Sequence, residues 1–263
     1  MSRRTNALAL PLLLLILALG VPSVALAASG GGSVSPGGGA SAGGGSGSAS
    51  GGSGPGANVQ PGNGTVTANS DGLTLVSRAS AMLRNQLSLT GRAPTGEAGQ
   101  TVEIDRLGHQ TNWRWTPTAQ ATVSRDGSFS VTWKTDHIGR FAIRALISQP
   151  RRSHATSALP TVTVTVYRVS KATQYGPGFY GQRTACGTRL RPSTIGVASR
   201  TLKCGTQVAI YYHGRTLVVP VIDRGPYANG ADWDLTEATG KALGIDGTAE
   251  IGAVSLPAPP PSS

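Results

Sequence analysis

Strict alternation of apolar and polar residues is the feature of this sequence that most restricts its fold. The alternation is complete in Thr161-Val-Thr-Val-Thr-Val166, and Phe141, Ile143, Ala145 and Ile147 repeat it. Successive side chains of a strand point to opposite faces, so this pattern predicts strands with one face in a core. Further short apolar runs lie between turn residues, at 87–89, at 102–104, and at 129–133 after the Asp126-Gly127 turn. Residues 65–168 are therefore predicted to form a β-sandwich with Trp133 in its core.

Trp113 and Trp115 fall in an alternating segment of the same region. If that segment is a strand, both indoles share one face, where they could pack in the core or stack on a glycan. The whole region resembles a bacterial immunoglobulin-like domain through its G-x-F-x-V-x-W and G-R-F-x-I-R-A strands. It contains no nucleophile, acid–base or metal constellation, which favours a spacer or binding module.

The first 28 residues have the features of an export signal. Arg3 and Arg4 precede an apolar run, and the small residues Ala25-Leu-Ala27 end that run. The alternative is an uncleaved membrane anchor, but two prolines and the Gly/Ser tract that follows disfavour it. We therefore expect a secreted, extracellular protein that meets the membrane only transiently, through its signal peptide.

Low-complexity segments flank the predicted folded part. Residues 29–64 hold 16 of the 37 glycines of the chain and no charged residue. Such a segment cannot bury enough apolar surface to offset its ordering entropy, so we predict a disordered linker. Residues 257–263 are rich in proline and are predicted to be a disordered tail.

Charge and cysteine content narrow the classes of partner. The formal net charge of +11 suits an anionic surface such as a cell-wall polymer, although solubility alone could explain it. Lys and Arg form no run or aromatic-interleaved stripe, which disfavours nucleic acid. Cys186 and Cys204 are the only cysteines, and in an exported chain they are expected to form a disulfide. The four histidines have no metal-ligand spacing, so we expect neither a metal site nor a cofactor.

Residues 169–256 differ in character from the predicted sandwich. Apolar runs at 207–212 and 216–222 flank His213-Gly214 and predict a hairpin. A helix is predicted over 235–243, where Gly244 would end it, and a last strand over 248–256. Many short strands with one short helix indicate a small closed β-barrel, so the fold class is all-β.

Several motifs in this region occur in a fixed order: Tyr175-Gly-Pro-Gly-Phe-Tyr-Gly181, Arg183-Thr-Ala-Cys-Gly187, Val221-Ile-Asp-Arg-Gly-Pro-Tyr227 and Asp234-Leu-Thr236. As a set they resemble the double-psi β-barrel domain of the rare lipoprotein A (RlpA) family of septal lytic transglycosylase-like proteins, a barrel that expansins share. The resemblance implies a six-stranded barrel that acts on peptidoglycan or another cell-wall polysaccharide. We expect a monomer with this barrel at 169–256.

Asp223 and Asp234 are the candidate catalytic residues. Asp223 ends an apolar strand and Asp234 follows eleven residues later, so both could face one groove. A lytic transglycosylase uses a hydroxyl of the sugar as nucleophile, so one carboxyl can act first as acid and then as base. Burial against Trp233 or Tyr227 would raise the pKa of that carboxyl, as an acid requires. The alternatives are structural: Asp234 could cap a helix, and Asp223 could pair with an arginine.

The resemblance also supplies candidates for binding and marks two departures. Expansin-like barrels have two aspartates at this spacing, and Thr173 matches a threonine in their groove; Tyr175, Tyr227, Trp233 and Arg224 are the further candidates for substrate contact. RlpA-type lytic enzymes carry a Glu where this chain has Thr188 and a His where it has Ser199. Either an aspartate therefore does the acid–base work, or the barrel binds glycan without cutting it, as an expansin-like binding or wall-loosening protein. A third possibility is an adhesin or spacer in which the barrel is only a platform.

Overall fold

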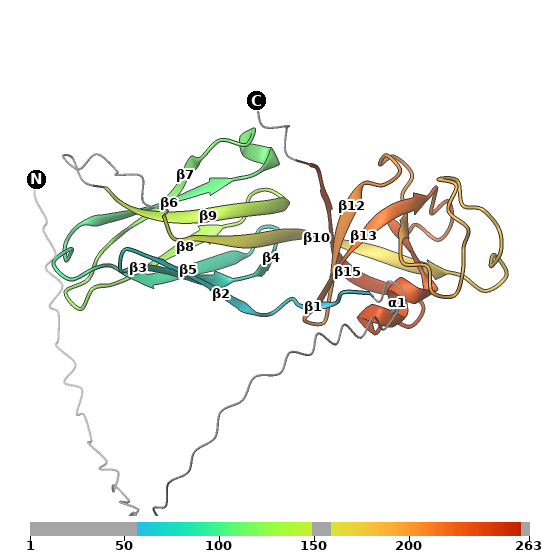
Figure 1. Ribbon diagram of the computed structural model, residues 1–263, viewed down its shortest axis with the longest axis horizontal. Coiled ribbons are helices and arrows are strands. Elements are labelled where there is room, and N and C mark those ends of the chain that lie inside the picture. The colour runs from blue at the N-terminus through green and yellow to red at the C-terminus, as the bar shows by residue number, and fades with distance from the viewer. Residues whose placement is uncertain (1–56, 149–158, 259–263) are drawn as a thin grey trace, which may run out of the picture. The chain divides into compact units, whose positions relative to one another are not determined.

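The computed structural model describes residues 57–148 and 159–258 of the 263-residue chain (Figure 1). The predicted signal peptide and most of the predicted linker and tail lie outside the described residues. Within the described ranges, no helix is long and apolar enough to cross a membrane. Strands account for most of the ordered backbone, with one α-helix and one short 3-10 helix among the described elements. The predicted all-β class is confirmed.

One sheet of the N-terminal part is built from four antiparallel strands. In the order in which they pair, these are β2 (Thr65–Ser70), β3 (Leu73–Arg78), β5 (Gln86–Arg92) and β8 (Ser128–Lys134) (Figure 1). In β3 and β5 alternate side chains are buried, as the sequence pattern requires. The buried set of this sheet includes Leu75, Leu89 and Trp133.

A second set of strands faces the same core. In pairing order these are β4 (Ser80–Met82), β10 (Thr161–Tyr175), β9 (Gly139–Ser148), β6 (Thr101–Leu107) and β7 (Thr116–Thr122). Phe141 and Val164 of this sheet join Trp133 of the other in one apolar cluster. The ring of Trp133 meets that of Phe141 edge-on, with 5.5 Å between centroids. Two sheets thus share one core, and Trp133 lies in it as predicted; the immunoglobulin-like topology stays a prediction.

The Trp113–Trp115 segment is not a strand, contrary to the expectation from its alternation. It follows a 3-10 helix (His109–Thr111), and both Asn112 and Trp113 have positive φ. The Arg144 guanidinium lies 4.2 Å from the centre of the Trp115 ring. The two indoles therefore do not form the shared strand face on which a glycan platform would depend.

The C-terminal part is a closed barrel of six strands. Around the ring they pair in the order β14 (Trp233–Thr236), β11 (Val197–Ala198), β13 (Arg215–Asp223), β12 (Gln207–Tyr212), β15 (Ala249–Leu256) and β10, which pairs again with β14. Side chains such as Val208, Val219 and Leu235 fill its interior. β10 runs without interruption from Thr161 to Tyr175, so the predicted domain boundary at residue 168 falls inside a strand. A short strand β1 (Gln60–Pro61), in the predicted linker, pairs with β13.

A two-residue turn joins β12 to β13, and capping residues set the two ends of the helix. The predicted hairpin is present, and His213 and Gly214 both have positive φ (44° and 80°), as a two-residue turn of this kind requires. Helix α1 (Glu237–Leu243) ends at Gly244, as predicted, but begins two residues later than expected. Its N-cap is Thr236, whose hydroxyl accepts a hydrogen bond from the Thr239 N–H. Asp234 is therefore not the helix cap and lies within β14.

Candidate functional site

Four neighbouring strands of the barrel place Thr173, Asp234, Ala198 and Asp223 in one row. Ala198 of β11 is the register partner of Asp223 on one side and of Asp234 on the other, and Asp234 pairs with Thr173. Residues directly opposite one another in a sheet project to the same face. Because neighbouring strands lie about 4.8 Å apart, the backbones of Asp223 and Asp234 are about 10 Å apart. Ala198, which carries only a methyl group, lies between the two aspartates in this row.

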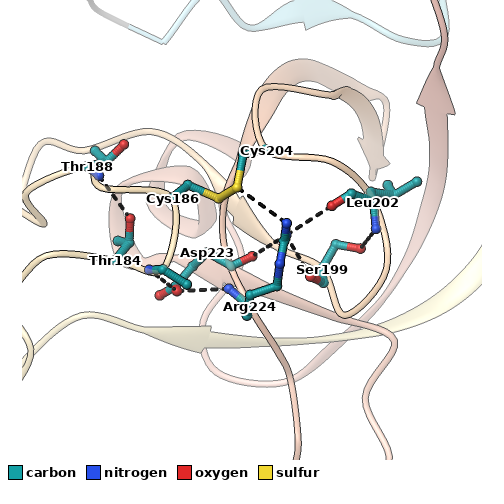
Figure 2. Close-up of a disulfide and its surroundings, with 9 residues drawn as sticks. Thr184, Cys186, Thr188, Ser199, Leu202, Cys204, Asp223 and Arg224 are labelled. Atoms are coloured by element: carbon teal, nitrogen blue, oxygen red, sulfur yellow. Dashed lines mark hydrogen bonds between the residues drawn. A yellow bond between two sulfur atoms is a disulfide. The ribbon is translucent and has the colours of Figure 1, made fainter.

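The carboxylate of Asp223 is held through one of its two oxygens. Oδ1 accepts hydrogen bonds from the backbone N–H groups of Ala185 and Arg224, both at 2.8 Å. No described residue donates a hydrogen bond to Oδ2, so this oxygen is available to a ligand. The Arg224 guanidinium binds the carbonyl oxygens of Leu202 and Ser199 instead of the carboxylate (Figure 2). The expected alternative, an ion pair between Asp223 and an arginine, is absent from the described part of the chain.

Asp234 occupies a different environment. Its Oδ1 accepts a hydrogen bond from the Thr173 hydroxyl at 2.9 Å. Burial raises the pKa of Asp234, the Thr173 hydroxyl lowers it in part, and the negative charge of Asp223 raises it further. The two carboxyl groups thus differ in hydrogen bonding: Asp223 accepts from two backbone N–H groups and Asp234 from a side-chain hydroxyl.

A groove of about 340 Å³ lies over this row. Five of the predicted site residues line it: Tyr175, Asp223, Arg224, Tyr227 and Asp234. Tyr227 is 80% exposed and Phe179, which also lines the groove, is 54% exposed. Exposed aromatic rings beside half-buried carboxyl groups suit a ligand that has both apolar faces and hydroxyl groups.

Comparison with known proteins agrees with this geometry. Residues 169–255, which form the barrel, match the family described as lytic transglycolase. This part of the chain is an RlpA-like double-psi β-barrel domain.

Relatives of the RlpA-like barrel are found in several bacteria. Two relatives are named "Probable endolytic peptidoglycan transglycosylase RlpA". The protein from Synechocystis sp. is 40% identical over 87 residues, which cover 32% of this chain and 27% of the relative. The protein from Aquifex aeolicus is 41% identical over 76 residues, which cover 28% of this chain and 34% of the relative. The endolytic peptidoglycan transglycosylase RlpA of Campylobacter jejuni is 32% identical over 84 residues, which cover 30% of each chain. The similarity thus spans about a third or less of each relative. Among solved structures, the Streptomyces papain inhibitor is 27% identical over 34% of this chain and 93% of its own, with a TM-score of 0.28.

Thr188 makes its local contacts through its backbone, whereas Ser199 uses its hydroxyl. The Thr188 N–H donates to the Thr184 hydroxyl at 3.2 Å, and Thr184 N–H donates to the Thr188 carbonyl at 2.8 Å. Ser199 is 5% exposed, and its hydroxyl accepts a hydrogen bond from the Leu202 N–H (Figure 2). Neither residue lines the groove, so neither takes over the acid–base role of the Glu and His that the resemblance would place there.

Trp233 and Thr173 lie outside the lining of the groove. Trp233 precedes Asp234 in β14 and packs against the barrel core, since neighbouring strand residues face opposite sides. Its indole N–H is buried and has no partner in the described residues. Thr173 acts on the site only through its hydrogen bond to Asp234.

Tyr175 adds a second polar group that the fold leaves unpaired. Its hydroxyl is buried without a hydrogen-bond partner among the described residues. Burial raises the pKa of Tyr175 far above its usual value, and the charges of Asp223 and Asp234 raise it further. The side chain therefore stays a neutral O–H beside the two carboxyl groups.

Six lining residues were not predicted as site residues from the sequence: Phe179, Gln182, Arg183, Thr184, Leu190 and Ala198. Phe179 belongs to a motif that carried the family resemblance, so its signal was present. Ala198 had none, because a two-residue strand is too short to show a period.

The predicted disulfide between Cys186 and Cys204 is present, with 5.7 Å between the Cα atoms. In the described ranges, no group of three His, Cys, Asp or Glu residues could hold a metal ion. The groove is lined by carboxyl, hydroxyl and aromatic groups and by the side chains of Gln182, Arg183 and Arg224.

Proposed function

We propose that the RlpA-like barrel binds the glycan strands of peptidoglycan and cleaves them as a lytic transglycosylase, with Asp234 as the acid and base. The observation that carries this proposal is the row in which Asp234 and Asp223 flank Ala198 under an aromatic-rimmed groove. The names of the relatives, endolytic peptidoglycan transglycosylases, support the choice of substrate.

The reaction begins with the protonated carboxyl of Asp234. It gives its proton to the glycosidic oxygen as the bond from that oxygen to the anomeric carbon breaks, and positive charge develops on the sugar ring. The Asp223 carboxylate stabilises this charge, since its Oδ1 is fixed by two backbone N–H groups and its Oδ2 is available. A hydroxyl of the same sugar then attacks the anomeric carbon and returns its proton to Asp234. The product is an anhydro sugar, and the enzyme regains its starting protonation state.

Release of anhydro-muropeptides from purified sacculi tests this mechanism. Asp234→Asn should abolish release because an amide cannot donate the proton, and Asp223→Asn should lower it by about 100-fold or more. Asp246→Asn is the matched control, since Asp246 is exposed and outside the groove, and it should leave release unchanged. Unchanged release in both groove variants would remove Asp223 and Asp234 from the mechanism.

A second candidate function is glycan binding without cleavage. Thr188 and Ser199 favour it, because the resemblance places an acid and an imidazole at these positions and a hydroxyl replaces each of them. It predicts that the protein pellets with sacculi and releases no anhydro sugar. Failure to pellet at moderate salt, with no release, would instead leave the barrel as a structural platform.

We also propose that the protein works outside the cytoplasm, at the cell wall. The export-signal features of residues 1–28 and the Cys186–Cys204 disulfide both support this location. Mass spectrometry of the N-terminus of the mature protein, recovered from the medium or the wall, should show cleavage after the Ala25-Leu-Ala27 signature.

A further inference from the structure

The Cys186–Cys204 disulfide joins two loops that both attach to the end of β13, where Asp223 lies (Figure 2). On one side, Ala185 N–H donates to Asp223 Oδ1 at 2.8 Å and Cys186 N–H donates to the Ile222 carbonyl at 3.3 Å. On the other, Gly205 N–H donates to the Val221 carbonyl at 2.8 Å. The disulfide therefore links the two loops that are hydrogen-bonded to the strand end carrying Asp223, the candidate catalytic residue.

The two loops are held with unequal strength. The Cys204 loop is also bound by Arg224, whose guanidinium reaches the Leu202 carbonyl at 2.9 Å, the Ser199 carbonyl at 3.3 Å and the Cys204 Sγ at 3.4 Å. Three polar contacts would keep this loop in place if the bridge were opened.

The Cys186 loop has fewer attachments. In the described part of the chain, the hydrogen bonds that join residues 184–188 to β13 are the two from Ala185 and Cys186. The others are local: Thr184 bonds with Gly187 and with Thr188, and the Arg183 guanidinium donates to the Gly187 carbonyl at 2.9 Å. Ala185 is exposed, so water competes for its N–H. Without the bridge, this loop is the one expected to move.

We propose that the Cys186–Cys204 disulfide is the positioning device of Asp223, and that its reduction lowers the activity of the site while the barrel stays folded. The bridge holds Ala185 N–H on Asp223 Oδ1, which directs the other oxygen to the ligand. This inference rests on the proposed function for its effect on catalysis, but the contact on which it depends can be measured without activity. Asp223 is the group in contact with substrate; the cysteines act through it.

The chemistry of opening is a thiol–disulfide exchange. A dithiol such as dithiothreitol attacks one sulfur, releases the other as a thiol and then closes on itself. The protein gains two thiols as the dithiol becomes a cyclic disulfide. The electrons and the two protons come from the dithiol.

The test compares the oxidised protein, the protein reduced with dithiothreitol, and the Cys186→Ser/Cys204→Ser double variant. Amide hydrogen exchange at Ala185 should become about tenfold faster in the reduced protein and in the double variant. The amides of Val208 and Ile210, in β12, should keep their protection and so show that the barrel is folded. Unchanged exchange at Ala185 would overturn the proposal.

Activity supplies the second readout. In the reduced protein and the double variant, kcat for release from sacculi should fall about tenfold while pelleting with sacculi is retained, because the carboxylate and not the groove is disturbed. Dithiothreitol should have no effect on the double variant, which serves as its matched control. Faster exchange at Ala185 with unchanged kcat would also overturn the proposal. If the oxidised protein releases nothing, the proposed function fails, and Ala185 exchange still decides whether the bridge positions Asp223.

Discussion

The Thr173 hydroxyl donates a hydrogen bond to Asp234 Oδ1 at 2.9 Å, across parallel strands on which the two residues are register partners. This bond favours the charged form of Asp234, whereas burial and the charge of Asp223 favour the neutral form. The net effect is a raised pKa, so Thr173 limits a shift that the rest of the site produces. The pH range over which Asp234 can act as an acid therefore depends in part on the Thr173 hydroxyl.

Thr173→Val should raise the pKa of Asp234 further, because the hydrogen bond to the carboxylate is lost while the volume is kept. The alkaline limb of the pH profile for anhydro-muropeptide release should then move to higher pH, since the acid stays protonated over a wider range. Thr248→Val, at an exposed position outside the groove, should leave the profile in place. A limb that does not move in Thr173→Val would mean that Asp234 is not the titrating acid.

Asp234 should also affect stability with a definite sign. Its pKa is raised in the folded state above 3.8, so the folded protein binds the proton more tightly than the unfolded chain. The stabilisation that this gives is fully present below pH 3.8 and is lost as pH rises through the raised pKa. Asp234→Asn should remove this loss, so the variant should melt at a higher temperature than the wild type at pH 7, with a smaller difference at pH 3.5. If the variant gains less stability over the wild type at pH 7 than at pH 3.5, the direction of the pKa shift of Asp234 is contradicted.

The strands that could be predicted are those with one buried and one open face. In β5 burial alternates as the sequence does, and the same holds at the start of β10. From Val164 to Tyr167 of β10 every residue is buried, so alternation stops although the strand continues to Tyr175. The boundary predicted at residue 168 therefore falls where β10 changes its pairing partner from β9 to β15, and not at the end of the strand.

The carboxyl groups of the candidate site could be proposed from the sequence because they lie in recognisable motifs. Their relation to each other depends on β11, a strand of two residues whose place between β13 and β14 is set by pairing far along the chain. Local sequence carries no signal for that pairing. The orientation of Trp233 follows once β14 is known to be a strand, because Asp234 faces the groove and its neighbour must face the core.

Tyr175→Phe should stabilise the protein. The hydroxyl is buried without a partner in the described residues, and an unsatisfied buried polar group costs about 1–3 kcal/mol. Its removal should raise the free energy of unfolding by about 1 kcal/mol or less, since the ring keeps its packing. Tyr211→Phe is the matched control: that hydroxyl donates to Asn63, so its loss should destabilise by about 0.5–1.5 kcal/mol. Urea denaturation measures both, and a destabilised Tyr175→Phe would show that the hydroxyl has a partner.

Tyr227→Ala should weaken binding to sacculi without a loss of stability. The side chain is 80% exposed at the rim of the groove, so the folded protein gains little from packing it. If sugar rings stack on it, pelleting should fall by about tenfold, and Phe179→Ala on the same rim should act in the same direction. Val218→Ala, which also truncates an exposed apolar side chain but lies outside the groove, should pellet like the wild type. Equal pelleting in all three variants would exclude the aromatic rim as a binding surface.

Arg144 should be important for the stability of the N-terminal sheets. Its Nε and Nη2 donate to Asp105 Oδ2 at 3.0 and 2.8 Å, and the two residues are register partners on β9 and β6. Asp105 is 5% exposed, so Arg144→Met would leave a buried carboxylate without its cation, which costs about 3–5 kcal/mol.

A second substitution separates loss of the ion pair from loss of packing. In Asp105→Leu/Arg144→Met both charges are gone, and most of the lost stability should return because the desolvation cost of the carboxylate is gone. Lys134→Met, which removes an exposed cation from β8, should change stability by only about 0.5 kcal/mol. Urea denaturation of the three variants gives the comparison. If Arg144→Met and the double variant are equally unstable, the packing of Arg144 on Trp115 matters more than its charge.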